Sequence, residues 1–188
     1  FAAGVTDGSL AMRLTPDTTI ALTVSGAVYF VGGDFGSISA TLATGKFNTT
    51  GIDYSGVNSE VLSIDTVSAT LDVGIDVRSV SIVGLEGEIS GFVTFGGNFA
   101  IRQVVGGNVD IVATEAFAIV VAGEFEAGVT NGTLALRLTP ESTIALTVSG
   151  SVHFVGGDFG SISATLATAK LNETTVDYSG TNAEIITI

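Results

Sequence analysis

One fifteen-residue phrase, FVGGDFGSISATLAT, occurs twice in this chain, at 30–44 and at 154–168. A shift of 124 residues aligns the two copies and extends the match to 1–64 and 125–188, where 46 of the 64 aligned pairs are identical. Similarity at a fixed period is typical of arrays in which each unit contacts its neighbours. We therefore interpret 1–124 as one repeat unit and 125–188 as the first half of the next unit.

A weaker similarity divides the unit itself. The segment VSGAVYF at 24–30 resembles ISGFVTF at 89–95, and the two are followed by the phrases GGDF and GGNF. This pattern predicts two diverged halves within the unit, with a boundary near residue 65.

Alternation of apolar and polar residues with a period of two predicts β-strands along most of the unit. The alternation is clear at 19–30, 37–44, 63–77 and 88–95, and no segment has the spacing and caps of a helix. The abundant Thr, Val and Ile fit a pleated surface. The predicted fold class is all-β, an elongated tandem-repeat array of long strands with β-solenoid-like stacking. A chain of β-sandwich domains is the alternative.

Two dipeptides at equivalent places in the copies predict turns. Asp7-Gly8 and Asn131-Gly132 stand between apolar-alternating runs. Such pairs favour two-residue hairpins, in which both central residues need a positive φ. We therefore expect turns at Asp7, Gly8, Asn131 and Gly132.

The charge composition restricts the partners of this chain. Hydrophobic residues make up 46% and charged residues 13%, and 19 Asp and Glu against 6 Lys and Arg give a net charge of −13. Nucleic acids and anionic membranes are held through Lys and Arg, so we expect neither as a partner. No apolar run is long enough to predict a transmembrane segment. The expected partners are copies of the chain itself or adjacent repeats.

The residues offer little for catalysis. The chain has no Cys, and its one histidine, His153, is replaced by Tyr29 in the first copy. A Ser-His-Asp set would need a histidine that is positioned by its neighbours. We therefore expect no enzymatic activity.

Carboxylates are the candidate metal ligands, because calcium takes six to eight oxygen ligands from Asp, Glu and backbone carbonyls. No motif requires a cofactor, and calcium is the ion that these residues favour, with solvated surface carboxylates as the competing interpretation. We expect Asp72 and Asp76 to share one face of a strand. The candidates are Asp34, Asp158, Asp53, Asp177, Asp72 and Asp76.

Two further features concern carbohydrate. Asn48, Asn131 and Asn172 begin N-x-[ST] triplets and are candidate glycosylation sites. Binding to a carbohydrate or a host surface would need a cluster of exposed aromatic side chains, which the three tyrosines (Tyr29, Tyr54 and Tyr178) do not form by themselves.

The phrases TIALTVSGAVYFVGG, FEAGVTNGTLALRL and ATLATGKFNTT resemble the repeats of giant tandem-repeat, β-strand-rich surface proteins of bacteria, which are adhesin-like or fibre-forming. The resemblance covers the whole chain and assigns no functional residue. It implies an extracellular or cell-surface location, a structural or adhesive role, and calcium as a ligand common in similar proteins. We expect a structural repeat segment of an extracellular fibre, filament or surface layer that assembles by stacking of β units. A spacer or stalk repeat of a large bacterial adhesin is the alternative.

Overall fold

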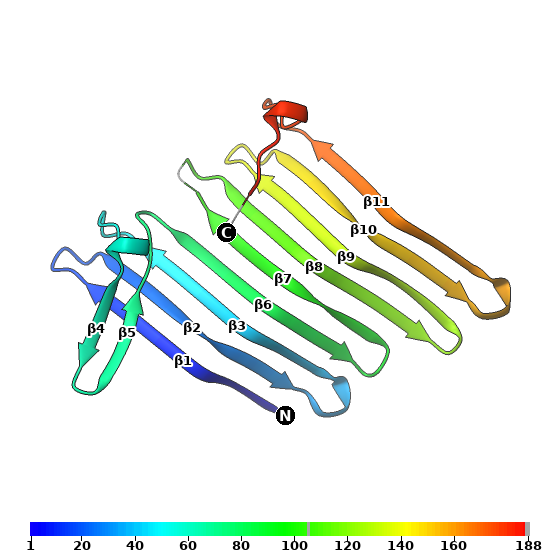
Figure 1. The fold of residues 1–188 in the computed structure, drawn as a ribbon, viewed down its shortest axis with the longest axis horizontal. Helices are drawn as coiled ribbons and strands as arrows, with labels where there is room; N and C mark the ends of the chain where they lie inside the picture. The colour runs from blue at the N-terminus through cyan, green and yellow to red at the C-terminus, as the bar shows by residue number, and fades with distance from the viewer. Residues whose placement is uncertain (105, 187–188) are drawn as a thin grey trace.

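The chain forms one large antiparallel β-sheet that carries a short β-hairpin on one face (Figure 1). The computed structural model describes residues 1–104 and 106–186. Each sheet strand pairs with the next sheet strand along the chain, and the all-β prediction is confirmed. In sheet order the strands are β1 (Ala2–Leu14), β2 (Ile20–Val31), β3 (Ser37–Asn48), β6 (Arg78–Ile89), β7 (Val93–Gln103), β8 (Val109–Ala122), β9 (Phe125–Leu138), β10 (Ile144–Gly156) and β11 (Ser161–Asn172).

The long connection between β3 and β6 contains the hairpin. Its strands are β4 (Glu60–Ile64) and β5 (Val67–Leu71), and β5 contacts β1 and β2. Four short 3-10 turns complete the described elements: η1 (Gly33–Phe35), η2 (Gly56–Asn58), η3 (Gly157–Phe159) and η4 (Gly180–Asn182).

A small core lies between the hairpin and the sheet. Leu71 and Val73 are fully buried there, together with Tyr54 of the preceding loop. The sheet contributes Ala11 and Ala21, whose small side chains leave room for the larger ones above them. Full burial of a side chain such as Leu or Val contributes about 1.5–3 kcal/mol, so this cluster holds the hairpin on the sheet.

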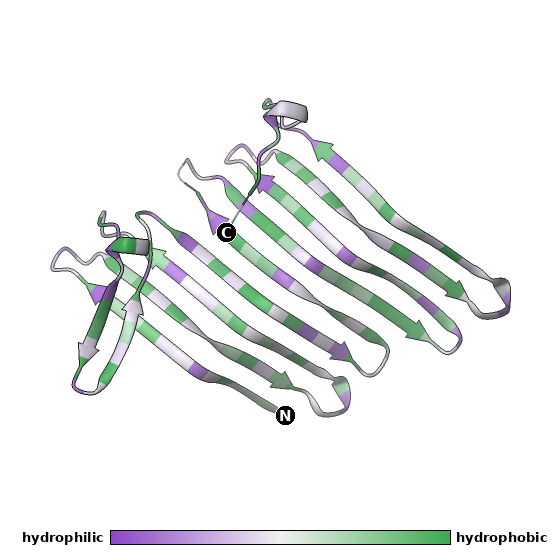
Figure 2. Cartoon of the chain, viewed as in Figure 1, coloured by the Kyte–Doolittle hydropathy of each residue, from purple (hydrophilic) through white to green (hydrophobic). Residues whose placement is uncertain are grey.

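The pairing register separates the side chains of the sheet onto two faces, because successive strand residues point in opposite directions. The row of directly opposed residues that defines the apolar face consists of Leu10, Val24, Gly45, Val80, Ile101, Ile111, Leu136, Leu146 and Leu171. The adjacent row, which defines the polar face, includes Lys46, Arg102, Asp110 and Arg137. Figure 2 shows this alternation along the strands.

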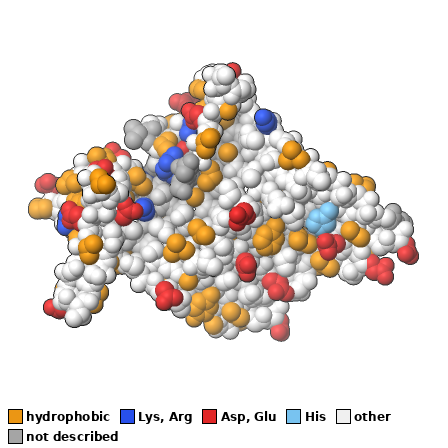
Figure 3. All heavy atoms as spheres, viewed as in Figure 1, with side chains coloured by type: hydrophobic (Ala, Val, Ile, Leu, Met, Phe, Trp, Pro, Cys, Tyr) orange, Lys and Arg blue, Asp and Glu red, His pale blue; other side chains and the backbone are white. Residues whose placement is uncertain are grey.

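The hairpin lies on the polar face, because Ala11 and Ala21 beneath it belong to rows of that face. Figure 3 shows this side of the molecule, where acidic and basic side chains lie over the hairpin and the sheet. On the apolar face, Leu10, Val80 and Ile101 stay 58%, 53% and 48% exposed. The sheet therefore presents a wide apolar surface without cover from the described residues.

The prediction of hairpin turns at Asp7-Gly8 and Asn131-Gly132 is wrong, because both pairs lie inside long strands, β1 and β9. Each pair faces a single glycine of the next strand, Gly26 or Gly150, and so forms a β-bulge. The expected positive φ is present at Asp7 and Asn131, at 51° in each. Gly8 and Gly132 lack the positive φ that the predicted turn also requires, and the flanking residues continue to pair with one neighbouring strand.

Two predicted strands are interrupted by turns. The segment 63–77 turns back at Asp65, whose φ is 53°, and so forms parts of β4 and β5. The segment 88–95 turns between β6 and β7, where Ser90 has a φ of 50°. The related phrase at 24–30 lies wholly inside β2, so the two similar phrases adopt different local structures. Residue 65 falls at the tip of the hairpin, between the sheet strands β1 to β3 and β6 to β8 of the unit, and a boundary between two halves there stays a prediction.

The two copies of the repeat lie side by side in one sheet. Strands β9, β10 and β11 correspond to β1, β2 and β3, and β9 pairs with β8 of the first unit. Solenoid-like stacking is not confirmed by this arrangement, in which neighbouring units are joined by strand hydrogen bonds.

Candidate functional site

The candidate site of this chain is best understood from its first copy, where Asn48 organises the loop after β3. The Asn48 side chain is fully buried. Its Nδ2 donates to the carbonyl oxygens of Ile52 at 2.7 Å and Gly74 at 3.0 Å, and the Thr50 N–H donates to its Oδ1 at 2.9 Å. One side chain thus joins the end of a sheet strand, the following loop and the segment after β5.

The same loop forms in the second copy. Asn172 Nδ2 donates to the Val176 carbonyl oxygen at 2.8 Å, and the Thr174 N–H donates to Asn172 Oδ1 at 3.0 Å. The carboxylate of Asp177 accepts a hydrogen bond from the Ser179 N–H at 2.9 Å, as Asp53 does from Ser55 at 2.9 Å. The loop therefore takes its shape without a counterpart of β5.

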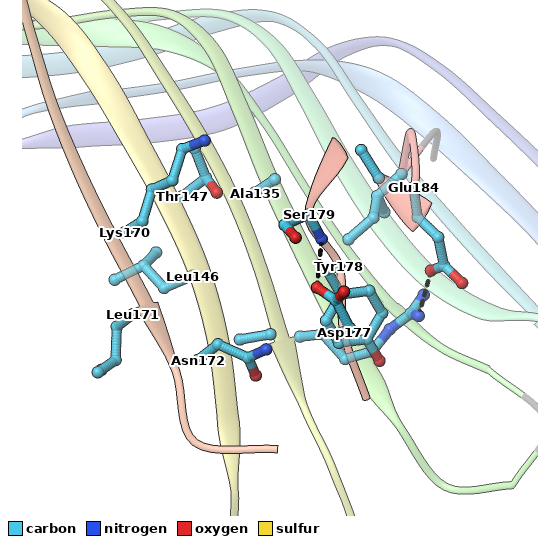
Figure 4. Close-up of a pocket in the computed structure, with 14 residues that line it drawn as sticks. Ala135, Leu146, Thr147, Lys170, Leu171, Asn172, Asp177, Tyr178, Ser179 and Glu184 are labelled. Atoms are coloured by element: carbon cyan, nitrogen blue, oxygen red, sulfur yellow. Dashed lines mark hydrogen bonds and ion pairs between the residues drawn. The ribbon is translucent and has the colours of Figure 1, made fainter. Parts of the chain in front are cut away.

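A groove of about 600 Å³ lies beneath this second loop (Figure 4). Its walls come from β9, β10, β11 and the segment after β11. The residues that line it include Ala135, Ala145, Thr147, Lys170, Asn172, Tyr178 and Glu184. A shift of 124 residues turns this set into Ala11, Ala21, Thr23, Lys46, Asn48, Tyr54 and Glu60. The groove is thus the place that β5 and the residues after it occupy in the first copy.

In the first copy, Thr23, Lys46 and the backbone of Tyr54 contact Asp72 and Val73, which directly follow β5. Lys46 Nζ donates to Asp72 Oδ2 at 2.8 Å, and the Asp72 N–H donates to Thr23 Oγ1 at 3.1 Å. The backbones of Tyr54 and Val73 exchange two hydrogen bonds, of 3.0 and 3.2 Å. Lys46, and then the Gly56 N–H, hold the pKa of Asp72 below its usual range.

In the second copy, the equivalent groups face the groove. Thr147 and Lys170 are exposed, and Tyr178 is half-buried where Tyr54 is 1% exposed. Among the described residues, no ion pair engages Lys170 and no backbone hydrogen bond engages Tyr178. Within the described part of the chain, the groove therefore combines an apolar floor with a cation and a tyrosine backbone that lack the partners found in the first copy.

An ion cluster borders the groove where the two units meet. Asp110 of β8 is fully buried, and Arg137 of β9 holds it with two hydrogen bonds, of 2.7 Å from Nε and 3.0 Å from Nη2. Arg102 of β7 adds a third contact at 3.3 Å. Burial by itself would raise the pKa of Asp110, but the two arginines outweigh it and hold the pKa below its usual range.

Arg137 connects this cluster to the groove. It pairs with Glu184, and its guanidinium lies 5.8 Å from the centre of the Tyr178 ring. In the first copy, Arg13 similarly pairs with Glu60 at 2.6 Å and lies 5.4 Å from the Tyr54 ring centre. In the described sheet order Arg13 belongs to the edge strand β1, and its side chain is 37% exposed against 15% for Arg137.

The six predicted calcium ligands do not form one site, although Asp53 lies near enough to Asp72 to oppose the lowering of its pKa. No group of three or more His, Asp or Glu side chains that could hold an ion occurs in residues 1–104 and 106–186. The bonds from Ser55 and Ser179 lower the pKa of Asp53 and of Asp177. Asp72 is paired with Lys46. Asp34 and Asp158 lie in η1 and η3.

Asp76 does not share a strand face with Asp72, because β5 ends at Leu71 and Asp76 has a φ of 55° in the following turn. The long alternating run predicted continuous pairing, but only Val73 after β5 forms a further bridge, to Tyr54. Calcium binding stays a prediction.

The structure also bears on the two carbohydrate hypotheses, glycosylation of asparagine and carbohydrate binding by tyrosines. Asn48 is a buried structural residue whose amide is fully engaged, so it offers no acceptor for a glycan. Tyr54 is buried beneath the hairpin, Tyr178 faces the groove, and Tyr29 of β2 packs against Gly4 of β1. The three tyrosines therefore form no common platform.

Sequence reasoning missed the ion cluster. Asp110 interrupts an otherwise apolar run, VDIVA, and an arginine stands at the same place in both copies, as Arg13 and Arg137. These were the available signals, but pairing Asp110 with Arg137 and Arg102 requires the order of the strands in the sheet.

Comparison with protein-family models, with curated proteins and with solved structures finds no match to this chain. Across 1–104 and 106–186, no helix has the length and apolar character needed to cross a membrane. Function is therefore inferred from the geometry of the sheet and the groove.

Proposed function

We propose that this chain is a structural repeat segment of an extracellular fibre, filament or surface layer, and that its β units assemble by stacking. The observation that carries the proposal is the apolar face, which crosses all nine strands and leaves Leu10, Val80 and Ile101 about half exposed. Exposed apolar surface of this extent marks an interaction site. Two units that stack through their apolar faces bury this surface and keep the polar faces outward.

The edges of the sheet support an array of repeats. The free edge of β1 corresponds to the edge of β9 that pairs with β8, and the free edge of β11 corresponds to the edge of β3 that pairs with β6. Both free edges thus have the pattern of edges that are paired inside the sheet. Neighbouring repeats that continue the same strand order would satisfy them.

The net charge of −13 fits this role. Repulsion between the acidic surfaces of two chains keeps them soluble, and it opposes association least at the apolar face. The extracellular location and the structural role are supported by the resemblance to bacterial surface-protein repeats. Copies of this chain or adjacent repeats are the proposed partners.

Stacking is tested by placing a charge on one face at a time. Ile101 and Thr94 lie on β7, and their register rows belong to the apolar and the polar face. Sedimentation velocity over a range of concentrations should show association of the wild-type chain. Ile101→Lys should weaken it about tenfold or more, because an unpaired charge is costly to bury. The charge-matched control Thr94→Lys should leave association unchanged.

A wild-type chain that stays monomeric at high concentration would contradict stacking and favour a spacer or stalk repeat. Equal effects of Ile101→Lys and Thr94→Lys would show that association depends on net charge and not on the apolar face.

A further inference from the structure

We propose that the groove beside β9, β10 and β11 binds, as an added β-strand, a second copy of segment 66–77 of this repeat. In the first copy that segment is TVSATLDVGIDV, and it lies on the equivalent surface. This inference does not depend on the proposed fibre role, because it concerns the polar face of the sheet and a different contact.

The apolar floor of the groove fits the side chains of the segment. In the first copy, Leu71 and Val73 lose all exposure against Ala11, Ala21 and Tyr54. The groove contains the same three residue types in Ala135, Ala145 and Tyr178. An incoming Leu and Val would therefore find the same floor.

The polar groups of the groove fit the one acidic residue between those two side chains. Lys170 occupies the position of Lys46, which contacts the Asp72 carboxylate at 2.8 Å. Thr147 occupies the position of Thr23, which exchanges hydrogen bonds of 3.1 and 3.2 Å with the Asp72 backbone. In an added segment, the carboxylate of Asp72 would bind Lys170 and its backbone would bind the Thr147 hydroxyl.

The backbone that borders the groove can also pair with an added strand. Tyr54 pairs with Val73, and Val61 of β4 lies opposite Thr70 of β5. The corresponding residues Tyr178 and Ile185 lie in a segment without a β5 partner. Main-chain hydrogen bonds to an added strand provide affinity, and the pockets for alternate side chains provide specificity.

The loop beside the groove needs little rearrangement to accept the segment. Its loop already has the hydrogen bonds of the occupied copy: Asn172 to Val176 measures 2.8 Å where Asn48 to Ile52 measures 2.7 Å. A site that is formed in advance loses less conformational freedom on binding. The occupied first copy is thus a template for the complex.

The test uses a fluorescent synthetic peptide with the sequence of residues 66–77 and the full 188-residue chain carrying Ile101→Lys. That substitution suppresses stacking, so a failure of peptide binding is distinguishable from a failure of the proposed assembly. Fluorescence anisotropy should show saturable binding with one peptide per chain. A peptide with the same composition in scrambled order should not bind.

Charge variants locate the peptide. Lys170→Met should weaken binding about fivefold or more, because it removes a charge-assisted hydrogen bond. Arg78→Met removes one positive charge outside the groove and should leave binding unchanged. Lys170→Glu should abolish binding of the original peptide and restore binding of a peptide with Asp72→Lys. Circular dichroism checks that each variant retains its strand content.

Crosslinking tests the register. The chain has no Cys, so an engineered pair is unique. Ile185→Cys should form a disulfide with a Thr70→Cys peptide, as the Val61 and Thr70 pairing requires, and much more slowly with a Ser68→Cys peptide. Absence of saturable binding would overturn the proposal. Binding that ignores Lys170, the order of the peptide sequence or the register would overturn it as well and indicate a nonspecific apolar contact.

Discussion

At the scale of single residues, charge pairing decides which carboxylates are structural. Asp72 binds Lys46 and the Gly56 N–H, and Asp110 binds two arginines. Both were acidic residues among apolar neighbours in the sequence, and neither has a free carboxylate in the fold. An acidic residue among apolar neighbours is therefore better explained as the partner of a Lys or Arg on a neighbouring strand than as a metal ligand.

The lowered pKa of Asp72 predicts how acid affects the hairpin. Because the folded pKa lies below the unfolded value of about 3.9, the stabilisation is complete above that value and is lost as the pH falls through the folded pKa. Thermal unfolding followed by circular dichroism from pH 7 to pH 2 should show a smaller loss in Asp72→Asn than in the wild type. Asp65→Asn, in the exposed hairpin turn, is the control and should follow the wild type. Parallel curves for Asp72→Asn and the wild type would show that the Lys46 pair contributes nothing.

At the scale of elements, the hairpin is a separate unit that is held by few contacts. It has two strands of five residues each, too short to be stable alone in water. Its stability depends on Leu71 and Val73, which bury themselves against alanines of the sheet. The hairpin should therefore open before the sheet does.

Leu71→Ala tests this dependence. The substitution leaves a cavity at a fully buried position, and we expect the hairpin to be destabilised by about 2–5 kcal/mol. Hydrogen exchange of the Tyr54 and Val73 amides should accelerate accordingly, while amides of β6 and β7 should not change. Val67→Ala, at a 72% exposed position of the same strand, should have little effect. Equal acceleration across the hairpin and the sheet would mean that the two unfold together.

At the scale of the whole molecule, the sheet is open and periodic. Unit 1–124 contains β1 to β8, and the pairing of β8 with β9 is the pairing that a second unit offers through its β1. In that contact Arg13 takes the place of Arg137 and meets Asp110. A heterologous contact of this kind gives an open filament unless the rotation between units closes it into a ring.

A fragment that ends at residue 124 should therefore associate head to tail through β8 and β1. Asp110→Asn should weaken the association, because it removes the charge that Arg13 of the next unit pairs with. Sedimentation velocity and electron microscopy should show chains of units in the wild-type fragment and shorter ones in the variant. Asp65→Asn is the charge-matched control. A strictly monomeric fragment would contradict edge pairing between units.

Much of the architecture was accessible from local patterns. Alternation predicted the strand positions in β2 and β3 but merged the end of β4 with β5 into one run, and the Asp-Gly and Asn-Gly pairs predicted positive φ at Asp7 and Asn131. Whether such a pair becomes a turn or a bulge depends on the strand that lies opposite. Gly26, which faces Asp7-Gly8, lies on another strand, so the local signal was right about the first residue of each pair and wrong about its glycine and about the topology.

By itself, the sequence determined the all-β class, the period of 124 residues and the separation of apolar from polar side chains, because these depend on neighbours along the chain. The tertiary structure alone decided that the two copies share one sheet and that Asp110 is buried between Arg102 and Arg137. These features depend on which strands lie side by side. Strand order is set by contacts between residues far apart in the chain, and a period-two pattern does not encode it.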